Sequence, residues 1–131
     1  MRDRVLAEPI ELKVPAQKSM MLVIRLTAAG VIARAGLTVD RLDDVKMAVE
    51  EACTCMIEAA QPPKNLKLTF SEWEDGLRIL ICGDCACGGA TPDEDEINVV
   101  RCILESLANG VEIFRSGDQL TGIELRVSPC A

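Results

Sequence analysis

The stretch Ala48-Val49-Glu50-Glu51-Ala52-Cys53-Thr54-Cys55 lies in the middle of a segment with helical periodicity. Apolar residues recur through this segment at spacings of three and four, which predicts a helix from Thr38 to about Ala60 with one buried stripe. Glu51 and Cys55 are four residues apart, so the helix places both side chains on one face. The segment therefore combines a core-facing stripe with a polar face suited to a functional site. The stripe consists of Leu42, Val45, Val49, Ala52 and Met56.

Turn and cap residues divide the rest of the chain into short elements. Gly36 is a natural end for the preceding helix, and Thr38 is a good N-cap for the next one, with Asp40 in its first turn. Asp75-Gly76 predicts a hairpin, because glycine tolerates the positive φ of tight turns. The expected elements are a strand Ile10–Val14, a helix from Pro15 to about Ala35, the helix ending before Pro62-Pro63, strands Leu66–Trp73 and Leu77–Cys82, a helix Glu94–Ala108 stopped by Asn109-Gly110, and strands Val111–Phe114 and Leu120–Val127 around Ser116-Gly117-Asp118.

This order of elements predicts an α/β two-layer sandwich. A mixed, mainly antiparallel sheet with the helices on one face buries the apolar side of every element most simply. The 131 residues are expected to form one domain, residues 1–131, with a core of its own.

Composition excludes several classes of function. The formal net charge is −7 and aromatic residues make up 2% of the chain, which argues against nucleic-acid and anionic-membrane partners and favours a protein partner with a basic patch. The chain has no His, so the commonest general base and metal ligand is missing. The N-terminus does not read as a signal peptide, and no apolar run approaches the roughly 20 residues of a membrane span, so we expect a cytoplasmic protein.

Several motifs together resemble one family of regulatory kinases. Leu12-Lys13-Val14-Pro15-Ala16 looks like its first strand and turn, and Arg25 occupies the place of an arginine in its first helix. Asp43–Val49 is similar to the lead into its asparagine box, which reads roughly Ala-Val-x-Glu-Ala-x-Thr-Asn. Glu51 and Thr54 match that box. The chain thus resembles the anti-sigma-factor serine kinases of the histidine-kinase-like ATPase superfamily over about residues 8 to 127.

The resemblance implies roles for individual residues. Glu51 matches the general base that takes a proton from a serine on a partner protein, so it is the candidate catalytic residue. The candidate nucleotide-binding residues are Thr54 and Cys55 in the box, with Asp84 and Gly88 in the motif Asp-x-Gly-x-Gly, whose Asp reads the adenine amino group. Cys55 stands where the family has the Asn that holds Mg²⁺.

The sequence departs from the family at the nucleotide site. A neutral thiol at position 55 is a poor ligand for Mg²⁺, which prefers oxygen. Ala86 replaces one glycine of the nucleotide motif, and the phosphate lid is reduced to Ala90–Glu96 with acids at 93 to 96. Those acids would repel a triphosphate, although acids in the first turn of a helix also favour its dipole. We therefore expect no cofactor, with ATP and Mg²⁺ as the alternative.

The seven cysteines leave a second alternative open. In a cytosolic chain they read first as reduced thiols or metal ligands. Cys55, Cys82, Cys85 and Cys87 are the candidates for a zinc or iron–sulfur site beside the former nucleotide pocket. Structural burial of these thiols is the simpler explanation, so no metal is expected.

The resulting hypothesis is a regulatory protein-binding domain of the anti-sigma-factor type, with weak or lost ATP binding. Its expected partner is a sigma factor or an anti-sigma antagonist, bound through residues 25–34 or the acids at 93–96, and a homodimer is expected by analogy. One alternative is an active ATP-dependent serine kinase, and another is a thiol-based metal or redox sensor on the same scaffold. Whether the chain is an enzyme stays open at this point.

Overall fold

The computed structural model describes residues 8–59, 62–73, 76–84, 93–117 and 119–128. The elements in chain order are β1 (Ile10–Pro15), a 3₁₀ turn η1 (Lys18–Met20), α1 (Met21–Arg34), α2 (Val39–Ile57), β2 (Asn65–Trp73), β3 (Gly76–Gly83), α3 (Glu94–Leu107), β4 (Gly110–Ser116) and β5 (Gln119–Val127).

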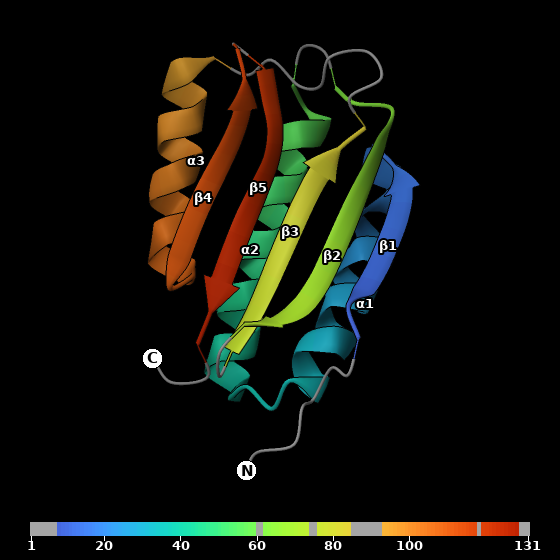
Figure 1. Cartoon of the computed structure of the whole chain (residues 1–131), viewed down its shortest axis with the longest axis vertical. Helices are drawn as coiled ribbons and strands as arrows, with labels where there is room; N and C mark the ends of the chain where they lie inside the picture. The colour runs from blue at the N-terminus through green and yellow to red at the C-terminus, as the bar shows by residue number, and fades with distance from the viewer. Residues whose placement is uncertain (1–7, 60–61, 74–75, 85–92, 118, 129–131) are drawn as a thin grey trace.

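The five strands form one sheet in the order β1-β2-β3-β5-β4, and every pairing in the described sheet is antiparallel. The three α-helices all cover the same face of the sheet, whereas the other face, toward the viewer in Figure 1, carries no helix (Figure 1). The predicted two-layer architecture, with a mainly antiparallel sheet and helices on one side, is confirmed.

Strict alternation along the strands decides which residues reach the core. In β3, Leu77, Ile79 and Ile81 are buried under the helices, and Arg78, Leu80 and Cys82 point to the open face. Cross-strand register keeps the apolar rows aligned, as in the pair Leu68–Ile81. The helices contribute the opposite side of this core, chiefly Ile24, Ala28 and Ile32 from α1, Val45, Val49, Ala52, Cys53 and Met56 from α2, and Leu104 from α3.

The local signals at the helix ends are largely confirmed. Gly36 has φ +74° after α1, and the Thr38 hydroxyl accepts a hydrogen bond from the Arg41 amide at 3.3 Å. The expected helix after Pro15 is divided, because a 3₁₀ turn precedes α1. The next helix ends at Ile57, earlier than expected, and Ala60 lies outside the described residues.

Gly76 begins β3, but it does not supply the positive φ of a tight turn that the sequence predicted. It pairs with Trp73, and its φ is not positive; among the described glycines only Gly36 and Gly117 have positive φ. A Cβ on Gly76 would lie 1.9 Å from the carbonyl oxygen of Val127. Glycine is therefore required because the end of β5 approaches this backbone closely.

Candidate functional site

The residues of the central stretch meet in a cavity between α2 and α3. The core-facing side of α2 is buried, which leaves Glu51, Thr54 and Cys55 half-buried on the side toward α3. They line a cavity of about 410 Å³, as the four-residue spacing of Glu51 and Cys55 predicted. The remaining lining residues are Glu58, the C-cap of α2, and Asp95, Glu96, Val99 and Val100 from α3.

The polar wall of this cavity is acidic. Glu58 forms an ion pair with Lys18 at 2.9 Å. Within the described part of the chain, Glu51, Asp95 and Glu96 form no salt bridge with a cation. A polyphosphate in this cavity would meet uncompensated carboxylates, and like charges at short range oppose binding.

The Cys55 thiol is neutral at physiological pH. Burial and, to a smaller extent, the negative charges of Glu51 and Glu96 together raise its pKa to about 11. Because a metal-bound cysteine is a thiolate, the same carboxylates oppose metal ligation by Cys55. Cys53, two residues earlier and on the core side of α2, has its pKa raised to about 12, chiefly by burial.

The other candidate residues lie elsewhere. Asp84 follows the end of β3 and accepts a hydrogen bond from the Asn65 side-chain amide at 3.3 Å. Asp84 and Cys82 line a different cavity from the one that contains Glu51. Gly88 lies outside the described residues, as do Ala86, Cys85 and Cys87.

Cys55 and Cys82 lie on opposite sides of the sheet. Cys82 points to the open face, because its neighbours Ile81 and Gly83 face the helices, and Cys55 lies in the helix layer. The alternation of β3 thus places the sheet between the two sulfurs. Among residues 8–59, 62–73, 76–84, 93–117 and 119–128, no group of three His, Cys, Asp or Glu side chains is arranged to hold a metal ion.

Comparison with known proteins places this geometry in a family. Residues 14–98 match a family model described as a histidine kinase-like ATPase domain. The chain belongs to the histidine kinase-like ATPase family. The predicted resemblance is therefore confirmed, and Glu51, Thr54 and Cys55 of the cavity lie within the matched region.

Curated relatives of this ATPase domain are serine kinases. The chain is 41% identical over 81 residues to the serine-protein kinase RsbW of Bacillus subtilis (strain 168), covering 60% of this chain and 51% of that protein. It is 38% identical over 76 residues to RsbW of Bacillus cereus (strain AH187), covering 56% and 48%. The chain thus spans about half the length of the curated relatives it matches.

A solved structure agrees on the fold. The crystal structure of the RsbU and RsbW domains of Rv1364c from Mycobacterium tuberculosis superimposes with a TM-score of 0.72 at 13% identity. The match covers 93% of this chain and 32% of that one. In the described part of the ATPase domain, none of the helices is long and apolar enough to cross a membrane.

The acids at 93–96 begin α3 of the ATPase domain. Asp93 is the N-cap, and its carboxylate accepts a hydrogen bond from the Asp95 amide at 3.0 Å. Glu94 binds Arg115 on β4 at 2.5 Å, and this hydrogen bond lowers the pKa of the Glu94 carboxyl. Asp95 and Glu96 face the cavity. The acids at 93–96 therefore interact favourably with the positive end of the helix dipole, as predicted. Two of them also form part of the acidic wall of the cavity around Glu51.

Sequence reasoning missed an apolar groove between α1 and α2. Leu22, Leu26 and Met47 are 60%, 65% and 55% exposed and line a hollow of about 490 Å³. Arg25 and Glu50 form an ion pair across it. The sequence of α1 could have indicated this groove, because its apolar residues are distributed around the whole helix. A helix that covers a sheet needs an apolar stripe on one side alone.

Proposed function

We propose that this domain is a regulatory protein-binding module of the anti-sigma-factor type, in which binding of Mg-ATP is weak or lost. The observation that carries the proposal is the composition of the cavity around Glu51. A neutral thiol at Cys55 and three carboxylates without a salt-bridge partner in the described residues form its polar wall. The thiol is not the oxygen ligand that Mg²⁺ prefers, and the negative charge of the carboxylates repels phosphate.

The α1–α2 groove supports the binding role. Exposed leucine and methionine side chains beside an ion pair form an apolar centre with a charged rim, the usual anatomy of a protein interface. Arg25 lines this groove and belongs to the segment 25–34 that we propose for partner binding. The proposed partner is a sigma factor or an anti-sigma antagonist, and a homodimer is the proposed assembly.

Substitution in the groove tests this role. Leu26→Asp places a charge in the apolar centre, and its affinity for a purified sigma factor or antagonist of the native host is expected to fall at least tenfold, the scale of one interface anchor. Ile103→Asp on α3 is the matched control, because Ile103 is also an exposed apolar side chain, 37% exposed, but does not line the groove or the cavity around Glu51. Equal affinity of wild type and Leu26→Asp in calorimetry would remove the groove from the proposal.

An active serine kinase is the second candidate. It is favoured by the position of Glu51 beside Thr54 at one cavity, where a general base would need to be, and by the serine kinases among the relatives. Transfer of labelled phosphate from ATP to a serine-bearing antagonist, abolished by Glu51→Gln, would establish this candidate. Partner binding without such transfer supports the regulatory module.

A further inference from the structure

The open face of the sheet contains a cavity that is separate from the cavity around Glu51. It has a volume of about 540 Å³ and lies where β1, β2 and β3 run side by side (Figure 1). Its size is in the range of small-molecule sites. The lining residues are Glu11, Lys13, Asn65, Leu66, Lys67, Cys82, Gly83 and Asp84.

Two lysines face each other at this cavity. The register of β1 and β2 pairs Lys13 directly with Lys67, and like charges in opposed positions destabilise a sheet. Glu11 compensates one of them through an ion pair with Lys67 at 3.2 Å. In the described residues, Lys13 has no salt bridge to an acidic side chain.

Protection of a sheet edge explains why a lysine is present at position 13, but it does not explain why Lys67 lies opposite it. Lysine on an edge strand such as β1 discourages pairing with other chains. Lys67 lies on β2, an inner strand, where no edge needs protection. The carboxylate of Asp84 at the far wall accepts a hydrogen bond from the Asn65 amide, 3.3 Å away. Of the two lysines in this wall, Lys13 is thus the one without a salt bridge to an acidic side chain in the described residues.

We propose that this cavity binds a small anion, a carboxylate or phosphate, between the ammonium groups of Lys13 and Lys67. A shared anion removes the repulsion of the pair and forms charge-assisted hydrogen bonds to both. The site is on the opposite face of the sheet from Glu51, so it is separate from the ATPase cavity and does not depend on the proposed function.

Cys82 provides a reporter inside this site. Its thiol is half-buried in the cavity wall, and Lys67 is its cross-strand neighbour. On its other side is Gly122, where a Cβ would lie 3.3 Å from the Cys82 sulfur. A bound anion should therefore shield this sulfur from a neutral alkylating agent. Cys102, exposed on α3, is the internal reference.

The test measures alkylation of Cys82 and Cys102 by iodoacetamide, with peptide-level mass spectrometry. Inorganic phosphate and succinate are titrated separately at constant ionic strength, so that the two arms distinguish phosphate from carboxylate. One of them is expected to slow alkylation of Cys82 at least threefold with a saturable concentration dependence, and to leave Cys102 unchanged.

Charge variants decide whether the lysines bind the anion. Lys13→Gln is expected to weaken binding about tenfold, the scale of a lost hydrogen bond to a charged group. Glu11→Gln is expected to strengthen it, because Lys67 is released from its ion pair. Lys46→Gln on α2 is the charge-matched control and should have no effect. Lack of protection by both anions, equal protection of both thiols, or full protection in Lys13→Gln would overturn the proposal.

Discussion

Cys55 is the residue on which the functional interpretation depends. Its position in the asparagine box was evident from the sequence, but its protonation state was not, since that depends on burial and on carboxylates from two helices. With Glu51 and Glu96 nearby, the pKa of the thiol is raised to about 11. The sequence therefore predicted a poor Mg²⁺ ligand, and the structure adds that the site also disfavours the thiolate.

Alkaline pH should expose this effect as a loss of stability. Cys53 and Cys55 have pKa values raised to about 12 and about 11 in the folded state, above the value of about 8.5 expected for an unfolded chain. From about pH 9 upward the unfolded chain releases these protons and the folded chain retains them, so the free energy of unfolding falls as pH rises. Urea titrations from pH 7 to 10.5 should show a shallower fall for Cys53→Ala and Cys55→Ser than for wild type. Parallel curves for all three proteins would contradict the raised pKa values.

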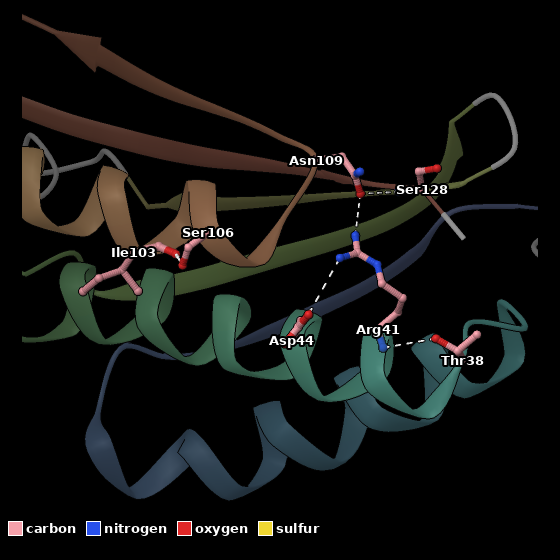
Figure 2. Close-up of polar contacts among 7 residues, drawn as sticks. All are labelled: Thr38, Arg41, Asp44, Ile103, Ser106, Asn109 and Ser128. Atoms are coloured by element: carbon pink, nitrogen blue, oxygen red, sulfur yellow. Dashed lines mark hydrogen bonds and ion pairs between the residues drawn. The ribbon is translucent and has the colours of Figure 1, made fainter. Parts of the chain in front are cut away.

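Asn109 is a second residue whose role was invisible in the sequence, where it read as a helix stop. Figure 2 shows its side-chain oxygen accepting hydrogen bonds from the Arg41 guanidinium and from the Ser128 amide, the latter at 2.8 Å. Arg41 also contacts Asp44 at 3.8 Å, and its side chain is 13% exposed. One amide thereby joins the start of α2 to the end of β5.

Asn109→Ala should leave the Arg41 charge poorly paired in a buried position. The expected loss of stability is about 1–3 kcal/mol, because the guanidinium loses a hydrogen-bond partner, keeps its desolvation cost and is left with the longer contact to Asp44. The double variant Arg41→Met, Asn109→Ala should recover part of this loss, as the guanidinium charge is then absent. Chemical denaturation checks both, and a single-variant loss below about 0.5 kcal/mol would show that the contact contributes little.

At the scale of elements, the sequence predicted the features that depend on neighbouring residues in the chain, such as where a helix begins. The helix start at Thr38 follows from side-chain capping and is correct in the structure, and the helix predicted from Glu94 begins at that residue. The requirement for Gly76 and the placement of Cys82 on the open face depend on which strand lies alongside and on which face the helices cover. These are long-range facts that local patterns do not encode.

A pair of glycine substitutions tests the element packing. Gly76→Ala should destabilise the protein by about 1–3 kcal/mol, because the new methyl group would overlap the Val127 carbonyl and push β5 away. Gly30→Ala in α1 meets nothing within 4 Å and should stabilise by about 0.5–1 kcal/mol through helix propensity. Thermal unfolding measures both. Equal effects of the two would contradict the close approach of β5 to β3.

For the whole molecule, the fold follows the family, and our proposal concerns the chemistry of the site. The apolar rows that hold the sheet to the helices are intact, and the family model matches residues 14–98. The cavity between α2 and α3 combines acids that begin one helix with acids of the other. Sequence reasoning identified both groups, but only the packing of α3 against α2 shows that Glu51 and Glu96 share one wall.

The most direct test of the central claim is calorimetric titration of the purified domain with ATP, with and without Mg²⁺. The acidic wall and the neutral thiol predict a dissociation constant in the millimolar range or no saturable binding, in both conditions. Cys55→Asn should not restore tight binding on its own, because the carboxylates of Asp95 and Glu96 remain in the wall. A wild-type dissociation constant of about 1 µM or tighter, equivalent to about −8 kcal/mol, would contradict the claim and favour an active kinase.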